Sequence, residues 1–253
     1  MVTISICTQK GGTGKSTSTV EVAAILKQRG YKVLVIDFDQ QCSLSKNIKA
    51  DLTKDTIYDV LHGTVPIADA IQQNDLFDII PGSASLSKAE REFVDMDDIF
   101  LLSDLTEYIT NNYDFLFIDN GPSRNILLTM TYIASDYIII PTESDESSID
   151  AVVTTQNDLK KFVEGRHHDS HAKIMGYILT KFENTTMHKI AHETLEDLAK
   201  EDDFDPFVAT VSKSIKMSEI KTYHTAISTT NEISKQAEEY NSIVDNILRK
   251  VGN

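Results

Sequence analysis

Cysteine and tryptophan are scarce in this sequence, which has two cysteines, Cys7 and Cys42, and no tryptophan among its 253 residues. Two cysteines far apart provide neither a disulfide framework nor the paired spacing of a zinc or iron–sulfur site. Cys7 closes an apolar run at residues 2–7, so we expect it to be a small buried side chain. With 10 glycines and 5 prolines, the chain is also neither collagen-like nor of low complexity.

Long apolar runs are absent as well. No uninterrupted apolar stretch approaches the roughly 18 residues that a membrane-spanning helix needs. The chain starts directly with a strand-like run, without a basic segment followed by a long apolar core. We therefore expect a cytoplasmic protein that does not bind a membrane.

Basic residues are in the minority. There are 24 Lys and Arg against 39 Asp and Glu, so the formal net charge is −15 with histidine neutral. The electric field of this negative charge repels polyanions at long range, and contact with nucleic acid would therefore require a local basic patch. The remaining composition, 41% hydrophobic and 25% charged, is ordinary for a globular protein.

Short apolar runs alternate with longer segments of helical periodicity along the chain. The expected strands are 2–7, 32–37, 77–81, 114–119, 136–141, 173–180 and 207–211. The expected helices are 15–29, 85–95, 100–111, 123–134, 146–163, 186–200 and 231–250, with two short ones at Thr56–His62 and Pro66–Gln72. Several strands are apolar almost throughout, as in parallel sheets covered on both faces. The pattern predicts one α/β domain over residues 1–253, with a doubly wound, mostly parallel sheet flanked by helices.

Residues 9–17, Gln-Lys-Gly-Gly-Thr-Gly-Lys-Ser-Thr, lie between the first expected strand and the first expected helix. This is the setting of a phosphate-binding loop, in which glycines let backbone amides turn toward phosphates at a helix N-terminus. Lys15 would reach the β- and γ-phosphates, and the Ser16 hydroxyl would coordinate Mg²⁺. The strict pattern G-x4-GK-[ST] fails only at Gln9. The expected nucleotide-binding residues are Gly11, Gly12, Thr13, Gly14, Lys15, Ser16 and Thr17.

Acidic residues close two of the expected strands. Asp37 and Asp39 stand two positions apart on an extended segment, so both face the same way. The carboxyl end of a strand beside a phosphate loop is where ligands bind in open α/β sheets. Asp119 closes another apolar strand, as a Walker B aspartate does. Each aspartate alone is also compatible with a cap or turn; together with the loop they favour a nucleotide–magnesium site.

The segments KGGTGKST, DFDQQ and FIDNGP together resemble the deviant Walker ATPases of the MinD/ParA superfamily, and within them the ParA family of DNA-partition proteins. The resemblance covers most of the chain, because Tyr58-Asp59-Val60-Leu61 and Ile215-Lys216-Met217-Ser218-Glu219 also fall in family order. It implies a fold of the P-loop NTPase type, with ATP and Mg²⁺ as cofactors.

The resemblance also implies a role for individual residues. Lys15 would bind the phosphates within its own subunit, whereas Lys10 would reach across a nucleotide-sandwich homodimer to the ATP of the partner. Asp39 would orient or activate the attacking water. The implied metal-site residues are Ser16 as a direct ligand and Asp37 and Asp119 in the water shell.

Three segments depart from the family pattern. Gln40 stands where a proline usually follows the second aspartate of the DxD box, and the usual D-x-P-P is Asp119-Asn120-Gly121-Pro122 here. The glycine predicts a more flexible switch segment after Asp119. The segment on the adenine side, usually I-P-R-N, reads Val211-Ser212-Lys213-Ser214.

Proteins of this family bind nonspecific double-stranded DNA through basic residues, and two local clusters are candidates. The clearer one contains Lys213, Lys216 and Lys221, with His224 beside them. The second contains Lys160, Lys161, Arg166, His167 and His168. Either cluster is also compatible with an ordinary solvated helix face.

The resemblance implies a ParA-type ATPase that dimerises on ATP and Mg²⁺ and binds DNA, where it would be nucleoid-associated. Slow hydrolysis stimulated by a ParB-like partner would then drive partition of plasmid or mobile-element DNA. A MinD-like membrane-surface ATPase is the alternative, but the acidic residues of 231–253 argue against lipid docking. A nucleotide-gated switch with weak hydrolysis stays open. A metabolic P-loop enzyme would not need Lys10, and an iron–sulfur reductase would need more cysteines.

Overall fold

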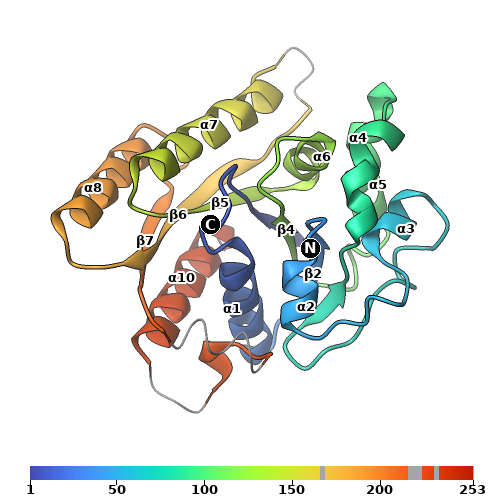
Figure 1. Cartoon of the computed structure of the whole chain (residues 1–253), viewed down its shortest axis with the longest axis horizontal. Helices are drawn as coiled ribbons and strands as arrows, with labels where there is room; N and C mark the ends of the chain where they lie inside the picture. The colour runs from blue at the N-terminus through green and yellow to red at the C-terminus, as the bar shows by residue number, and fades with distance from the viewer. Residues whose placement is uncertain (166–168, 216–223, 231–233, 253) are drawn as a thin grey trace.

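The computed structural model describes residues 1–165, 169–215, 224–230 and 234–252, and within them seven strands form one sheet (Figure 1). The strands are β1 (Val2–Ile6), β2 (Val33–Phe38), β3 (Asp78–Ile80), β4 (Phe115–Asn120), β5 (Tyr137–Thr142), β6 (Lys173–Phe182) and β7 (Phe207–Ser212). Their order is β3-β2-β4-β1-β5-β6-β7, and every neighbouring pair is parallel. The predicted doubly wound α/β fold is confirmed, and all seven predicted strands are present.

Most of the predicted helices are also present. The α-helices are α1 (Lys15–Gln28), α2 (Ser43–Asn47), α3 (Ile57–Leu61), α4 (Ala89–Glu92), α5 (Leu101–Glu107), α6 (Ile126–Ala134), α7 (Glu146–Val163), α8 (Thr186–Lys200) and α10 (Lys235–Val251). Short 3₁₀ helices are η1 (Ala84–Lys88), η2 (Met96–Phe100) and η3 (Ile227–Thr229). The single helix predicted over 85–95 is divided into η1 and α4.

The short helix predicted at Pro66–Gln72 is wrong. Residues 67–70 form turns, and Gln72 instead pairs antiparallel with Ile79 of β3. The Gln72 amide donates to the Ile79 carbonyl at 2.7 Å, and the Ile79 amide donates back at 2.9 Å. Because β3 is an edge strand, its outer backbone groups need partners, and this bridge supplies them.

Two apolar layers hold helices on both faces of the sheet. In the view of Figure 1, α1 and α10 lie below the sheet, and α6, α7 and α8 lie above it. Neighbouring β2 residues alternate between the layers: Val35 packs with the α1 and α10 side, and Leu34 and Ile36 with the other. Burial on both faces explains why the strands are continuous apolar runs.

The amphipathic helix α10 packs on the core. Its buried residues include Tyr240, Ile243, Val244 and Ile247, and the Tyr240 hydroxyl hydrogen-bonds Ser18 of α1 at 3.1 Å. In the part of the chain that the structure describes, no helix has the length and apolar character needed to cross a bilayer.

The order of the strands places a crevice beside β1. The chain leaves β1 through α1 on one face of the sheet, whereas it leaves the neighbouring β4 through α6 on the other face (Figure 1). Such a reversal is where ligands bind in doubly wound folds. The loop from β1 to α1 begins at this edge of the sheet, beside the carboxyl end of β4, and the end of β2 follows next in the strand order.

Candidate nucleotide-binding site

The loop between β1 and α1 has the backbone geometry of a phosphate cradle. Gly12 and Gly14 take φ angles of 83° and 89°, in the left-handed region that favours glycine. A Cβ atom at Gly14 would approach Thr180 Cγ2 at 3.2 Å, so this position also needs a small residue. Helix α1 starts at the next residue, Lys15, which brings its N-terminal amides to the end of the loop.

Lys15 lies inside the curve of this loop. Its side chain is buried, and its ammonium donates to the Lys10 carbonyl at 2.9 Å. Burial lowers the pKa of Lys15, whereas the nearby Asp119 carboxylate opposes that shift by favouring the charged form. The loop therefore encloses one cation in a partly desolvated place, where its attraction for phosphate is strongest.

Asp119 lies near the start of α1, and one of its carboxylate oxygens has no hydrogen-bond partner among the described residues. It accepts a hydrogen bond from the Thr19 hydroxyl at 3.3 Å, and the nearby Ser16 hydroxyl acts to lower its pKa. Burial raises the pKa of this carboxyl, and the neighbouring Asp37 raises it further. Asp119 Oδ2 is buried and has no hydrogen-bond partner among the described residues. A hard divalent cation would suit this set of oxygen atoms.

Asp37 is the neighbour of Asp119 across the β2–β4 ladder, but its carboxylate is engaged elsewhere. Its Oδ2 accepts hydrogen bonds from the Ser45 amide at 2.8 Å and the Ser45 hydroxyl at 2.6 Å. Asp37 thus holds α2 against the end of β2. Of the three predicted metal-site residues, Ser16 lies near Asp119, and Asp37 is the neighbour of Asp119 in the β2–β4 ladder.

Asp39 is half-buried at the end of β2 and rests against the segment that follows β4. A Cβ atom added to Gly121 would lie 3.0 Å from Asp39 Oδ1 and 3.2 Å from its Cγ. The side chain of a larger residue at position 121 would therefore push the Asp39 carboxylate away. Asp39 Oδ1 also accepts from the Gln41 amide at 3.0 Å.

Lys10 points away from Lys15, toward the start of α7. Its ammonium contacts Asp145 Oδ1 at 2.6 Å and the hydroxyls of Ser147 and Ser148 at 2.7 Å each. These hydrogen bonds hold the pKa of Asp145 well below its usual range. The sequence indicated the helix over 146–163 but not this contact, because Asp145 lies 135 positions from Lys10.

The basic clusters are only partly described. Lys213 is exposed and lies 3.3 Å from Glu183, whereas Lys216 and Lys221 lie outside the described residues. In the second cluster, Lys160 pairs with Glu164 at 3.5 Å and Lys161 with Asp158 at 2.7 Å. Residues 166–168 of that cluster lie outside the described part of the chain.

Comparison with known proteins identifies the family. The family AAA_31, described as an AAA domain, matches residues 1–174. An uncharacterized protein of Methanocaldococcus jannaschii is 32% identical over 85% of this chain and 86% of its own length. The chromosome-partitioning ATPase Soj of Treponema pallidum is 28% identical, covering 99% of this chain and 98% of its own length. This chain belongs to the ParA family of the MinD/ParA superfamily.

A solved structure agrees with this ParA-family membership. A plasmid partition protein of Borrelia burgdorferi, described as putative and bound to AMPPNP, superposes with a TM-score of 0.83 at 27% identity. The match covers 98% of this chain and 99% of that one. The resemblance read from the phosphate loop, the DxD box and the β4 segment is confirmed at the level of family and fold.

Proposed function

We propose that this ParA-type ATPase binds ATP with Mg²⁺, forms a nucleotide-sandwich homodimer, and partitions plasmid or mobile-element DNA. The proposal rests chiefly on two lysines of one loop that take separate positions. Lys15 is buried inside the loop, whereas the Lys10 side chain is 29% exposed and points away from Lys15, toward the start of α7. A cation inside the loop suits the ATP of the same subunit, and one that lies outside the loop is left for the ATP of a partner once α7 releases it.

Each remaining site residue takes a role that its surroundings support. Mg²⁺, when bound, would neutralise charge on the phosphates. Ser16 would hold it directly, and the free oxygen of Asp119 and the carboxylate of Asp37 would accept hydrogen bonds from its water shell. Gly11, Gly12, Thr13, Gly14 and Thr17 would surround the phosphates. Asp39, at the edge of the crevice, would orient the attacking water.

We further propose that the dimer contacts nonspecific double-stranded DNA through Lys213, Lys216 and Lys221. Because the chain carries a net charge of −15, these phosphate contacts must be few. Each neutralised phosphate contributes a log–log salt slope of roughly −0.9, so three lysines in each of two subunits would give a slope of at most about −5. Hydrolysis would be slow and would be stimulated by a ParB-like partner. The protein would be cytoplasmic and would associate with the nucleoid when ATP is bound.

The packing of α10 argues against the MinD-like alternative. Its apolar face contacts the core through buried side chains such as Tyr240 and Ile243, so that face is not available for a lipid surface. The proposed ATPase domain spans residues 1–253, because α10 completes the layer beneath the sheet.

The Asp39→Ala variant tests the proposal most directly. We expect it to bind ATP, to dimerise, and to hydrolyse ATP at least about 100-fold more slowly, since the attacking water loses its orienting carboxylate. The trapped dimer should bind DNA in ATP but not in ADP, as measured by size exclusion and by DNA binding in both nucleotides. Normal turnover by this variant would refute the role of Asp39. A wild-type protein that stays monomeric in ATP at every concentration would refute the dimer.

A further inference from the structure

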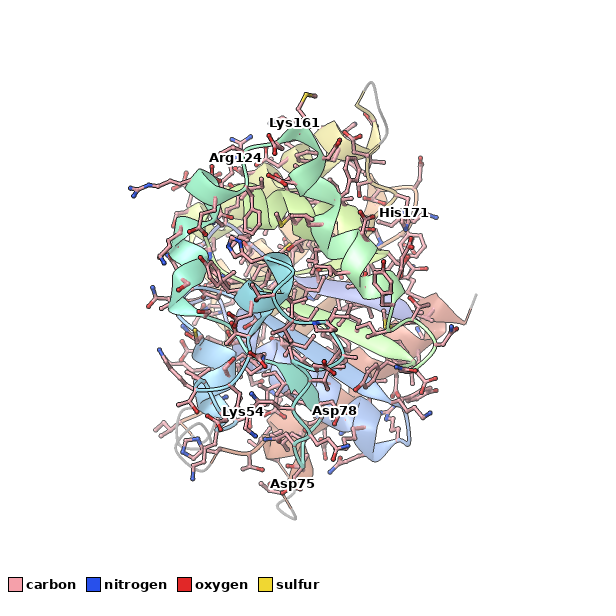
Figure 2. All side chains as sticks on the ribbon, turned by 90° about the vertical axis from the view of Figure 1, so that its right-hand side faces the viewer. Lys54, Asp75, Asp78, Arg124, Lys161 and His171 are labelled. Atoms are coloured by element: carbon pink, nitrogen blue, oxygen red, sulfur yellow. The ribbon has the colours of Figure 1, made fainter. Side chains whose placement is uncertain are left out.

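One buried carboxylate of α7 joins the two loops that form the site. Asp158 accepts a hydrogen bond from the Gln9 side chain at 2.6 Å and forms an ion pair with Arg124 at 3.0 Å. Gln9 begins the phosphate loop, and Arg124 belongs to the segment 121–125 between β4 and α6. The Asp158 side chain is only 5% exposed, although it carries a charge. Lys161 is its third partner, at 2.7 Å, and Figure 2 shows Arg124 and Lys161 at the same end of the molecule.

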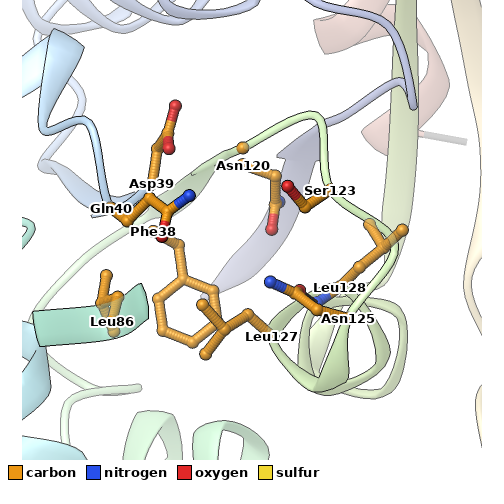
Figure 3. A pocket seen from close by; sticks show the side chains of 10 residues that line it. Phe38, Asp39, Gln40, Leu86, Asn120, Ser123, Asn125, Leu127 and Leu128 are labelled. Carbon is orange, nitrogen blue, oxygen red and sulfur yellow. Dashed lines mark hydrogen bonds between the residues drawn. The ribbon is translucent and has the colours of Figure 1, made fainter. Parts of the chain in front are cut away.

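The segment 121–125 in turn touches Asp39. Gly121 lies so close that an added Cβ would stand 3.0 Å from the Asp39 carboxylate oxygen. A small cavity of about 20 Å³ separates the rest of the segment from the end of β2. Figure 3 shows Asn120 and Ser123 on one side of this pocket and Phe38 and Asp39 on the other. A shift of the segment therefore changes the surroundings of Asp39 directly.

We propose that Asp158 is a positioning residue for hydrolysis, which holds the segment 121–125 against the phosphate loop through Arg124 and Gln9. This inference rests on the proposed ATPase function. The segment has glycine where the family usually has proline, so its backbone alone is less constrained. A side-chain contact to a helix supplies the missing constraint here. The same contact explains the glutamine at position 9, because a glycine there would leave Asp158 without one of its donors.

Two observations support a positioning role over a purely structural one. Gln9 and Arg124, the two partners of Asp158 near the site, belong to loops and not to the core. Arg124 also has most of its side chain in solvent. Asp158 itself is buried, but it keeps Gln9 and Lys161 as partners when Arg124 is removed, so its charge is not left unpaired. Loss of the Arg124 contact should therefore release the segment without unfolding the protein, and the effect should appear in turnover rather than in ATP affinity.

The test compares Arg124→Ala with Arg29→Ala. Arg29 forms a similar ion pair with Asp245, at 2.6 Å, but joins α1 to α10 far from the crevice. We expect Arg124→Ala to lower kcat about 10-fold with KM changed less than about twofold. Arg124→Lys should restore much of the rate, because a lysine can still pair with Asp158. Asp158→Asn combined with Arg124→Ala should be no slower than either variant alone.

Hydrogen exchange of the nucleotide-free protein gives a second readout. Amides of residues 121–125 should exchange at least about 10-fold faster in Arg124→Ala than in the wild type or in Arg29→Ala. If the amides of residues 121–125 exchange at the same rate in Arg124→Ala as in the wild type, the proposal is overturned, whatever the ATPase rate of the variant. Faster exchange with unaltered kcat would overturn the link to Asp39. Failure of the proposed function would look different, as a wild-type chain that does not dimerise with ATP.

Discussion

Replacing Lys15 with alanine is expected to weaken ATP binding at least about 100-fold, which corresponds to about 2.7 kcal/mol. The Lys15 ammonium lies inside the loop, where burial strengthens its attraction for phosphate oxygens. The truncated side chain would leave the Lys10 carbonyl without this donor with or without ATP, so the expected loss of affinity comes from the missing charge. Titration with a fluorescent ATP analogue in the presence of Mg²⁺ measures the change in Kd.

Lys27→Ala is the matched control for this variant. Lys27 stands in the last turn of the same helix, α1, and donates to the Asn74 carbonyl at 2.7 Å, away from the loop. Its loss should leave the Kd for the nucleotide unchanged within about twofold, because no phosphate charge lies near it. An ATP affinity that survives Lys15→Ala within threefold would refute the assignment of this loop as the phosphate site.

The sheet was predictable because its strands are buried on both faces. A strand covered by helices on each side is apolar at most positions, and such runs stand out against amphipathic helices. Even β3, with three residues, was found this way, because Phe77, Ile79 and Ile80 are all fully buried. The long helices α7 and α8 begin and end at the predicted residues, since each has a side-chain cap at its start.

Two short stretches of the chain that lack a clear periodic pattern were not predictable. Helix α2 has five residues and follows Cys42, which takes a left-handed φ of 51°. A hydrogen bond between Ser45 and the buried Asp37 holds this helix in place. Its five residues are too few to show a helical period in the sequence. The chain at Gln72 likewise pairs with β3 instead of forming a helix, because tertiary contacts override weak local propensity.

The candidate site divides in the same way. The loop, the DxD box and Asp119 carry recognisable spacing, and parallel strands bring their ends to one edge of the sheet. The partners supplied by α7 carry no such signal. Asp145 and Asp158 stand 135 and 149 positions from the loop residues that they bind, and an isolated aspartate in a helix is usually a solvated residue.

The Lys10→Ala variant is expected to bind ATP with unchanged affinity and to lose turnover at least about 100-fold, as phosphate transfer loses a positioned cation. In the described structure Lys10 is bound to Asp145, Ser147 and Ser148 of its own chain, so its action on a partner requires release from α7. The low pKa of Asp145 keeps that contact charged through the neutral range, so a change of pH around 7 should not release it. Phosphate release at saturating ATP measures the loss.

Two further variants decide whether Lys10 acts on its own subunit or on the other one. Asp145→Ala frees Lys10 from α7. It should preserve or raise turnover if the lysine acts across the dimer, and lower turnover if the lysine acts from its place on α7.

Mixing Lys10→Ala with Asp39→Ala gives the sharper answer. In a mixed dimer, the subunit that keeps Asp39 receives Lys10 from its partner, which rebuilds one of two sites. Random pairing should then recover about a quarter of wild-type turnover. If Lys10 instead acts within its own subunit, every site in the mixture lacks one residue and no turnover returns.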